Sequence, residues 1–374
     1  MKKILIVVNN ICEGGLTHVL LDFISVLSEY CQVTVLSIYD LSEVYKEEIN
    51  QKADFVTLDN YRNKLHNRYL RSINSRLIDN RKIQQYLYNW YLRKQSFDYE
   101  VAFAEDWALC LVVQSHAKSQ KLAWIHTDFL CNGVLDSQSD INKYNKLLSS
   151  FHQVIFVSDA LRKKFEKILG LTQTKTIPNA VDLAKIQTNL VSTPFILHDS
   201  HKVNFIYLGR LSQEKGVDRL LNSVSLMPKN LNDKWTLTII GDGEQHTNLS
   251  RIVQERGLEK NIFFCGIQKK PHSAFNNASA LLLPSRYEGF GLVLVEAMAA
   301  GLPVIATNTV GASEVLDNGR YGILLPNEDN AFDDILLSII KNPTLLEKYK
   351  PLSIKRANEY SISVFEKNIK AIIS

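Results

Sequence analysis

Residues 3–38 read KILIVVNNICEGGLTHVLLDFISVLSEYCQVTVLSI. The stretch begins with a continuous apolar run (3–8), which is typical of a parallel strand that is buried on both faces. After the loop 9–15, the apolar residues recur at helical spacing; they are Leu16, Val19, Leu20, Phe23, Ile24 and Leu27. A second strand pattern follows at 32–38. Strand, helix and strand in this order predict a βαβ unit, and therefore a parallel sheet.

The same alternation runs through most of the chain in two series. Further strand patterns of the first series are DFVTL, YEVAFA, KLAWIH and QVIFVS; those of the second are VNFIYLG, WTLTIIG, NIFFCG, ALLLPS and PVIAT. Between the series, residues 174–200 hold a short strand pattern, a proline turn and a polar, weakly patterned stretch, which indicate a linker. Residues 330–374 have helical patterns only.

Two such series predict an α/β protein with two doubly wound, Rossmann-like domains and a cleft between them. We expect an N-terminal domain at 1–185, a C-terminal domain at 186–355, and a helix at 356–374 that packs back on the N-terminal domain. Ligands of such sheets bind beyond the carboxyl ends of the strands, so functional residues are expected in the loops that directly follow strands.

The composition excludes several classes of protein. The chain has 374 residues, 45% of them hydrophobic and 22% charged, which suits two globular domains. Its net charge of +4 is too small to indicate a nucleic-acid binder. Five cysteines without a Cys-x-x-Cys pair argue against a disulfide framework and a zinc site. The apolar runs are too short for a signal peptide or a membrane span, so we expect a cytoplasmic location.

Two of the loops have features of an anion site. Gly14 and Gly15 precede a helix, where backbone N–H groups can approach an anion closely; a flexible turn is the alternative. This loop is not G-x-G-x-x-G, which disfavours a dehydrogenase. In the loop GRLSQEKG (209–216), Arg210 and Lys215 can surround a diphosphate with positive charge, and two solvated surface cations are an equal alternative.

The segment PSRYEGFGLVLVEAMAAGLP (284–303) is the most informative one. Glu288 lies in a tight turn whose N–H groups open a helix, and Glu296 lies inside that helix among apolar residues. A carboxylate in such a setting needs partners, which favours a functional role over a half-exposed helix position. His126 ends the strand pattern KLAWIH, so it is expected at the carboxyl edge of the first sheet; a structural histidine is the alternative.

Glu288 and Glu296 form a Glu-x7-Glu motif, and with it the sequence resembles the retaining glycosyltransferases of the GT-B fold, family four, which build bacterial polysaccharides and lipid-linked glycans. The segment 209–216 is similar to the phosphate-binding segment of this family, and PNAVD (178–182) to its hinge, with alanine in place of the usual glycine. The resemblance runs from the Gly14–Gly15 loop to about residue 330, and the more specific motifs lie in the C-terminal half.

The resemblance implies a nucleotide-diphosphate sugar as donor, with UDP favoured, bound mostly by the C-terminal domain. Arg210 and Lys215 would neutralise the diphosphate. Glu296 would accept hydrogen bonds from the ribose hydroxyls, and Glu288 would hold hydroxyls of the donor sugar. Further donor-binding positions are expected at Gly14, Gly15, Ile267, Phe290, Gly291 and Leu292.

Glu288, Lys215, Arg210 and His126 form the expected catalytic set, with His126 in contact with the donor sugar. No carboxylate is clearly placed as a nucleophile, so we favour same-face attack, in which the leaving phosphate takes the acceptor proton. The chain contains no Asp-x-Asp. We therefore expect no obligatory metal and no cofactor, since the two cations can balance the diphosphate charge.

Residues 60–94 hold nine Lys or Arg residues and one acidic residue, interleaved with tyrosine and tryptophan. Basic residues with interfacial aromatics favour contact with the anionic inner face of a membrane, and hence a peripheral location near a lipid-linked acceptor. A solvated helical hairpin is the alternative, and nothing else supports nucleic acid. The proposed surface residues are Arg68, Arg71, Arg76, Arg81, Lys82 and Trp90.

The sequence is compatible with two further functions. A GT-B nucleotide-sugar epimerase would share the fold and the diphosphate site but need no acceptor. A non-catalytic nucleotide-sugar-binding protein is less compatible with the set of Arg210, Lys215, Glu288 and Glu296. The sequence leaves the donor sugar, UDP versus GDP, the acceptor and the oligomeric state undetermined.

Overall fold

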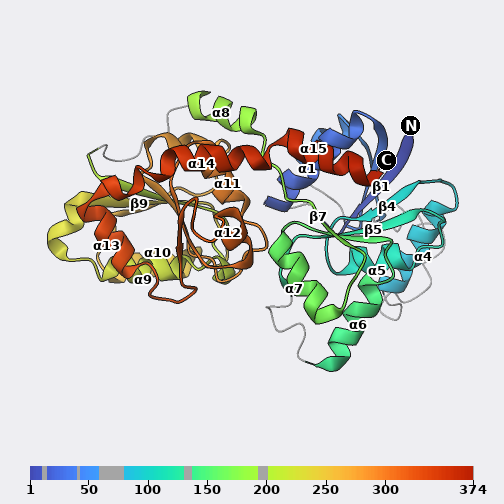
Figure 1. Cartoon of the computed structure of the whole chain (residues 1–374), viewed down its shortest axis with the longest axis horizontal. Coiled ribbons are helices and arrows are strands. Elements are labelled where there is room, and N and C mark those ends of the chain that lie inside the picture. The colour runs from blue at the N-terminus through green and yellow to red at the C-terminus, as the bar shows by residue number, and fades with distance from the viewer. Residues whose placement is uncertain (11–14, 40–42, 59–79, 130–136, 193–200, 374) are drawn as a thin grey trace, which may run out of the picture. The chain divides into compact units, whose positions relative to one another are not determined.

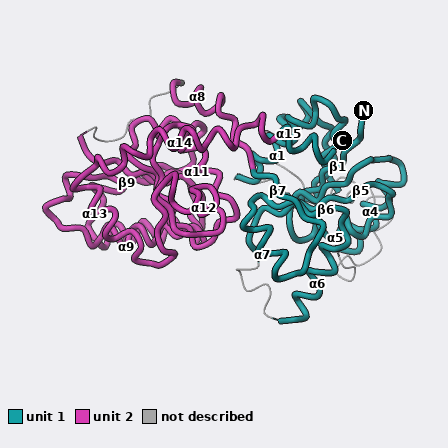
Figure 2. The backbone as a smooth tube through the Cα atoms, in the orientation of Figure 1, with its two compact units in different colours: residues 1–178, 366–374 teal, residues 179–365 magenta. Residues whose placement is uncertain are grey.

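The computed structural model describes residues 1–10, 15–39, 43–58, 80–129, 137–192 and 201–373. It divides into two compact units (Figure 2). The first consists of Met1–Pro178 with Glu366–Ser374, and the second of Asn179–Phe365. Each unit is a parallel sheet with helices packed against it (Figure 1). The α/β class with two Rossmann-like halves is therefore confirmed.

Seven strands form the sheet of the first unit within the described ranges, in the order β3-β2-β1-β4-β5-β6-β7. They are β1 (Lys2–Val8), β2 (Cys31–Ser37), β3 (Asp54–Thr57), β4 (Tyr99–Ala102), β5 (Gln120–Ile125), β6 (Gln153–Phe156) and β7 (Thr174–Thr176). The strand order reverses at β1, which pairs with β2 on one side and β4 on the other. Such a reversal is the switch point beside which doubly wound sheets bind ligands.

The central strand β1 explains the opening apolar run of the chain. Ile4, Leu5 and Ile6 have no exposed surface, because helices cover both faces of the sheet. Helix α1 (Gly15–Ser28) joins β1 to β2, so the expected βαβ unit is confirmed. The ring of Phe23 on α1 stacks on Phe103, with 5.0 Å between the ring centres.

The other helices of the first unit follow the strands in alternation. They are α2 (Glu43–Asn50), α4 (Asn80–Leu92), α5 (Trp107–Val113), α6 (Gln138–Leu148) and α7 (Asp159–Leu169). Ser158 caps α7, since its hydroxyl accepts the N–H of Leu161 at 3.1 Å.

Six strands form the second sheet in the part of the chain that the structure describes, in the order β10-β9-β8-β11-β12-β13. They are β8 (Val203–Leu208), β9 (Trp235–Ile240), β10 (Ile262–Phe264), β11 (Ala280–Leu283), β12 (Val304–Thr307) and β13 (Ile323–Leu325). The sequence patterns predicted five of these. The edge strand β13 was not among them, because three residues are too few for a periodic signal.

Helices and short 3₁₀ turns complete the second unit. They are α8 (Leu183–Ser192), η2 (Gln213–Lys215), α9 (Val217–Ser225), η3 (Lys229–Lys234), α10 (His246–Glu255), η4 (Pro271–Asn277), α11 (Leu292–Ala299), α12 (Val310–Val315), α13 (Asp333–Lys341), η5 (Pro343–Leu346), α14 (Tyr349–Ala357) and η6 (Asn358–Tyr360). Phe205, Tyr207 and Trp235 lie fully buried in the core of this unit.

The region read as a linker is more ordered than its sequence indicated. Helix α8 occupies part of it, because Ile186 and Leu190, four residues apart, bury one face of the helix. The side-chain amide of Gln187 donates to Ala299 O at 2.9 Å. The two units divide at Pro178–Asn179, whereas the sequence placed the boundary at 185–186. Val181 N donates to Tyr360 O at 2.9 Å, which ties this segment to the second unit.

The last helix, α15 (Ile362–Ile373), ends in the first unit. Ile369 is fully buried there, and Lys2 Nζ donates to Ile373 O at 2.8 Å. The ammonium group of Lys370 lies over the ring of Tyr30, 5.0 Å from its centre. The C-terminal residues thus complete the first unit beside strand β1.

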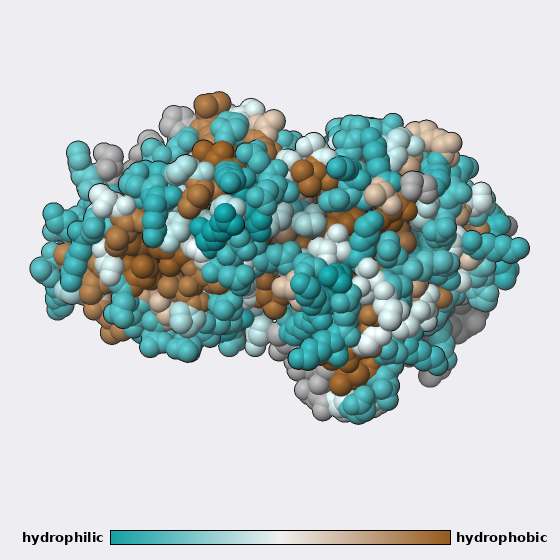
Figure 3. Space-filling view, viewed as in Figure 1, coloured by the Kyte–Doolittle hydropathy of each residue, from teal (hydrophilic) through white to brown (hydrophobic). Residues whose placement is uncertain are grey.

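Hydrophilic residues cover most of the face seen in Figure 3, and hydrophobic residues form several separate groups on it. No helix among the described residues is both long and apolar enough to cross a bilayer.

Candidate functional site

A lysine and a glutamate meet above the carboxyl ends of β8 and β11 in the second unit. Lys215 Nζ lies 2.7 Å from Glu288 Oε2, and their side chains are 24% and 14% exposed. The Ser285 hydroxyl also approaches Glu288 Oε2, at 3.4 Å. The structure therefore brings together two residues that the sequence placed in one site, 73 positions apart in the chain.

Backbone packing holds the two loops against each other. Gly216 has φ +67°, and a side chain there would place its Cβ 2.3 Å from Pro284 O. The glycine directly after Lys215 is thus required both for its left-handed backbone and for the close approach of the two loops. A larger residue at this position would separate Lys215 from Glu288.

Arg286 is a further side-chain link between these loops, and the sequence did not single it out. Its guanidinium group forms two hydrogen bonds with the Asp218 carboxylate, at 2.8 and 2.7 Å, and one with Gln213 O at 2.9 Å. Its backbone N–H donates to Glu214 O at 2.7 Å. Burial acts against ionisation of Asp218, yet the paired Arg286 holds the pKa of that carboxyl below its usual value.

The turn after Glu288 opens helix α11. Gly291 caps the helix with φ +89°. Phe290 is 3% exposed and packs its ring edge-on against Tyr360, so its side chain belongs to the core and its backbone to the turn. The first N–H groups of a helix have no intrahelical partner. Those at Gly291 and Leu292 are therefore suited to an anion or a hydroxyl group.

Glu296 lies on α11 with a histidine beside it. Its Oε2 is 3.3 Å from His272 Nε2, and the two side chains are 20% and 16% exposed. His272 Nδ1 lies 3.3 Å from the amide nitrogen of Asn189. If Nδ1 of His272 accepts a hydrogen bond from the Asn189 amide, the imidazole proton is on Nε2 and points to Glu296. Glu296 thus has a polar partner, His272, although the helix around it is apolar.

Arg210 and Ile267 are more exposed than Lys215 and Glu288. Arg210 is 62% exposed and forms an ion pair with Glu214, so its charge is compensated within its own loop. Tyr207 donates its hydroxyl to Arg210 O at 2.8 Å, which fixes the backbone at this position. Ile267 is 62% exposed and follows the end of β10.

His126 lies in the first unit, directly after β5. Burial lowers the pKa of its imidazole from 6.5 to about 3, so the ring is neutral near pH 7. Its Nε2 is buried and has no partner among the described residues, and the ring packs against Phe103 with 4.7 Å between centres. Gly15 begins α1, and Gly14 lies outside the described residues.

Asn9 and Glu105 hold the backbone around His126, and sequence reasoning missed both. Glu105 Oε1 accepts the backbone N–H groups of His126 at 2.6 Å and Thr127 at 2.8 Å. The side chain of Asn9 donates to Glu105 O at 2.7 Å and accepts Ala108 N at 2.9 Å. Burial raises the pKa of Glu105, although the N–H donors oppose this shift.

Asp106, enclosed by these bonds, has φ +63°, a strained value for a residue other than glycine. The strain is held in place by the two hydrogen bonds of Asn9 on either side of it. A signal was present in the sequence, because Asn9 and Glu105 directly follow strand patterns, as His126 does.

The neutral state of His126 predicts a pH-dependent stability. Below about pH 6.5 the unfolded chain binds a proton that the folded chain does not bind until about pH 3, so the free energy of unfolding falls over this range. His126→Gln removes this contribution. Between about pH 7 and pH 5 the wild type should lose about 2 kcal/mol more than the variant, measured by urea unfolding. Equal losses in the two chains would contradict the neutral buried state.

The proposed membrane surface is described only in part. Arg68, Arg71 and Arg76 lie outside the described residues. Arg81 and Lys82 are exposed at the start of α4, and Lys94 lies over the ring of Trp90 at 4.3 Å. Among the residues that the structure covers, no group of three or more His, Cys, Asp or Glu side chains could hold a metal ion.

Comparison with known proteins shows a similarity to one family over part of the chain. Residues 194–356 match the family model described as Glycosyl transferases group 1. An uncharacterized glycosyltransferase of Methanocaldococcus jannaschii is 27% identical over 241 residues, which cover 54% of this chain and 57% of that protein. The poly(glycerol-phosphate) alpha-glucosyltransferase of Bacillus subtilis is 24% identical over 225 residues, which cover 59% of this chain and 32% of that protein.

The poly(ribitol-phosphate) alpha-N-acetylglucosaminyltransferase of Staphylococcus aureus is 23% identical over 241 residues, which cover 63% of this chain and 46% of that protein. These three alignments span from 32% to 57% of the relatives' own length. Among solved structures, Anabaena HepE in complex with UDP and glucose is 21% identical with a TM-score of 0.78, and 100% of this chain and 99% of that chain are covered.

TarM is 15% identical with a TM-score of 0.79, and the match covers 99% of this chain and 98% of that chain. At these identities the likeness shows a common fold. The chain is thus an α/β protein of the GT-B class. Residues 194–356, within its second unit, are similar to the family described as Glycosyl transferases group 1.

Proposed function

We propose that the chain is a retaining glycosyltransferase. It transfers a sugar from a nucleotide-diphosphate sugar, preferably a UDP-sugar, to a glycan or lipid-linked acceptor in surface polysaccharide biosynthesis. The observation that carries this proposal is the pair of Lys215 and Glu288, a cation and a carboxylate 2.7 Å apart on loops that Arg286 and Gly216 fix. Relatives named as alpha-glucosyltransferase and alpha-N-acetylglucosaminyltransferase support it.

The donor is bound by opposite charges on the two loops. Lys215, and Arg210 once released from Glu214, neutralise the diphosphate, and the open N–H groups of Gly291 and Leu292 add positive potential. Glu288 accepts hydrogen bonds from hydroxyls of the donor sugar. Further contributions are the Gly15 amide to the diphosphate, Glu296 to the ribose, and the backbone near Phe290 and Ile267 to the sugar and the base.

The transfer step needs no protein nucleophile. The bond between the anomeric carbon and the diphosphate oxygen breaks, and the acceptor oxygen bonds to the same face of that carbon. The acceptor proton passes to the departing phosphate oxygen. Lys215 stabilises the negative charge that develops on this phosphate, which lowers the barrier without a metal. His126, as a neutral imidazole, offers a hydrogen bond to a hydroxyl of the substrate.

The proposal is tested with a panel of UDP- and GDP-sugars, scored for nucleotide release with and without a membrane lipid extract. We expect one UDP-sugar to release UDP, faster with the extract, and the product to keep the anomeric configuration of the donor. A new sugar epimer without any transfer product would identify an epimerase instead. Binding without release for every donor would identify a binding protein.

We also propose that the basic segment 60–94 places the enzyme peripherally on the anionic inner face of the membrane. Each Lys or Arg near such a surface contributes about 1 kcal/mol. The chain should therefore co-sediment with vesicles that contain phosphatidylserine at low salt and be released at high salt. Neutral phosphatidylcholine vesicles are the control. Equal sedimentation with both kinds of vesicle would contradict this location.

A further inference from the structure

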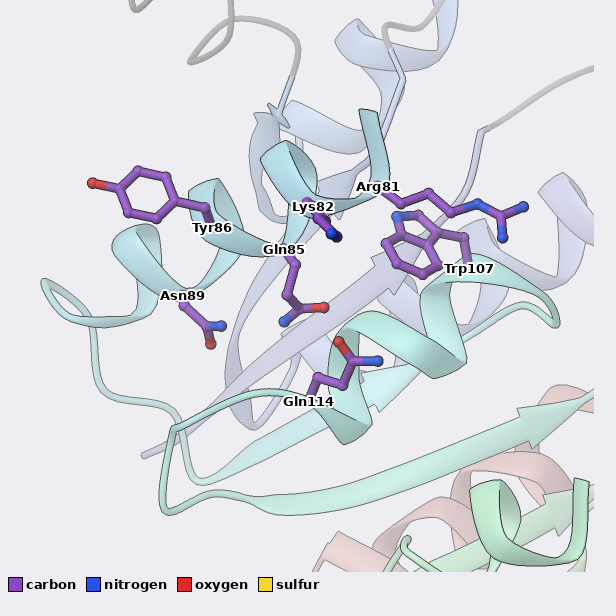
Figure 4. Close-up of a pocket in the computed structure, with 7 residues that line it drawn as sticks. All are labelled: Arg81, Lys82, Gln85, Tyr86, Asn89, Trp107 and Gln114. Carbon is purple, nitrogen blue, oxygen red and sulfur yellow. The ribbon is translucent and has the colours of Figure 1, made fainter. Parts of the chain in front are cut away.

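A pocket lies between α4 and α5 in the first unit. Its volume is about 440 Å³. Figure 4 shows the residues that line it, which come from α4 and from the region of α5; they are Arg81, Lys82, Gln85, Tyr86, Asn89, Trp107 and Gln114. Pockets of about 300–1,000 Å³ hold small organic ligands, so there is room for one phosphorylated sugar.

The charge of this pocket is positive. Arg81 and Lys82 line it, and none of its lining residues in the described part of the chain is a carboxylate. The guanidinium group of Arg81 lies over the ring of Trp107, 5.4 Å from its centre, which holds this cation at the edge of the pocket (Figure 4). Lys82 is exposed and forms no ion pair within the described ranges. The pocket is therefore suited to an anionic group.

The rest of the lining is suited to hydroxyl groups. Three neutral amide side chains, Gln85, Asn89 and Gln114, line the space. Gln85 Nε2 donates to Leu111 O at 3.4 Å and Asn89 Oδ1 accepts a backbone N–H, so the amide of Gln114 and the amide nitrogen of Asn89 are the groups suited to a ligand. In Figure 4, Gln85 and Gln114 extend toward one another from the two helices.

Hydrogen bonds to strand β4 hold the two helices that form the pocket in place. Glu100 on β4 has no exposed surface and accepts the hydroxyl of Tyr88 on α4 at 2.5 Å and that of Ser115 after α5 at 2.9 Å. Asn89 Oδ1 accepts the backbone N–H of His116 at 3.2 Å. The pocket is thus preformed, and a ligand needs little ordering of the protein to bind.

We propose that this pocket binds a phosphorylated saccharide unit of the acceptor. Arg81 and Lys82 hold the phosphate, and the amides of Gln114 and Asn89 read the hydroxyls. The identification of the ligand as part of the acceptor rests on the proposed function. Binding to the pocket can be tested without turnover.

The test uses the full chain with Lys215→Ala, so that binding at the proposed donor site is weakened. Glucose 1-phosphate is titrated into this protein by calorimetry. We expect binding, weakened about tenfold or more by Lys82→Gln and by Gln114→Ala, since each removes a direct contact. Both residues are exposed, so neither change should unfold the protein. The matched control is Arg93→Gln, on an exposed cation of the same segment outside the pocket, which should leave binding unchanged.

Three comparisons can overturn the proposal. Inorganic phosphate that binds as tightly as glucose 1-phosphate would make the pocket a simple anion site. Equal binding by the Lys82→Gln, Gln114→Ala and Arg93→Gln variants would place the ligand elsewhere. Phosphatidylserine vesicles that bind in a Lys82-dependent way, with no affinity for glucose 1-phosphate, would make it a membrane contact. A chain that binds glucose 1-phosphate but releases nucleotide from no donor would keep the pocket and refute the proposed function.

Discussion

Replacing Lys215 with alanine is expected to lower the rate of sugar transfer by at least about a hundredfold while the chain stays folded. Lys215 is only 24% exposed, and its ammonium group points at Glu288 from a loop that Arg286 and Gly216 fix. A preorganised cation in such a position stabilises the charge that develops on the leaving diphosphate. Steady-state rates of nucleotide release with the preferred donor give the measurement.

Lys260→Ala, on an exposed lysine of the same unit, is the matched control and should keep the wild-type rate. Glu288→Ala is expected to cause a comparable loss, because it removes the acceptor of the sugar hydroxyls and leaves Lys215 without its counter-ion. Glu288→Gln keeps the shape of the side chain and should retain more activity than Glu288→Ala. Near-normal turnover by Lys215→Ala or Glu288→Ala would remove this site from the reaction.

Glu100→Ala is expected to lower the free energy of unfolding by about 3–5 kcal/mol. Glu100 has no exposed surface, and it accepts the hydroxyls of Tyr88, Ser115 and Ser119. The substitution leaves these buried donors without a partner and opens a cavity between α4 and β4. Burial, and then the nearby carboxylate of Glu100, hold the pKa of Tyr88 well above its usual value, so the phenol remains a donor.

Urea unfolding at neutral pH measures this loss. Tyr88→Phe removes only one donor and should cost about 1–2 kcal/mol. Glu48→Ala, on an exposed glutamate of α2, is the control and should change stability by less than about 0.5 kcal/mol. Equal unfolding midpoints for Glu100→Ala and Glu48→Ala would show that the buried network does not stabilise the first unit.

Most of the fold could be predicted because the signals for its elements are local. The apolar run 3–8 indicated a strand covered on both faces, and β1 is fully buried at the centre of its sheet. Helix α8 was missed because its stretch is weakly patterned, and its two buried apolar residues, Ile186 and Leu190, reveal a buried face only once the rest of the second unit is in place.

The candidate site could be predicted only in part. Loop chemistry after strands pointed to Lys215 and Glu288, and the structure brings them within 2.7 Å. The residues that hold these loops and the loop of His126 were not predicted. Arg286 resembles an ordinary surface cation in sequence, and Asn9 and Glu105 follow strand patterns without any local sign of what they bond. Their roles depend on partners from other strands and loops.

The sequence by itself determined the two parallel sheets and the types of side chain at their carboxyl ends. The spacing of apolar residues and the turn residues that end each strand can be recognised within a few positions of the chain. Only the tertiary structure decided which of those side chains are paired, buried or charged. His126 is neutral and Glu100 is enclosed by hydroxyls for the same reason: desolvation and hydrogen-bond partners come from residues that are distant in the chain and meet only in the folded state.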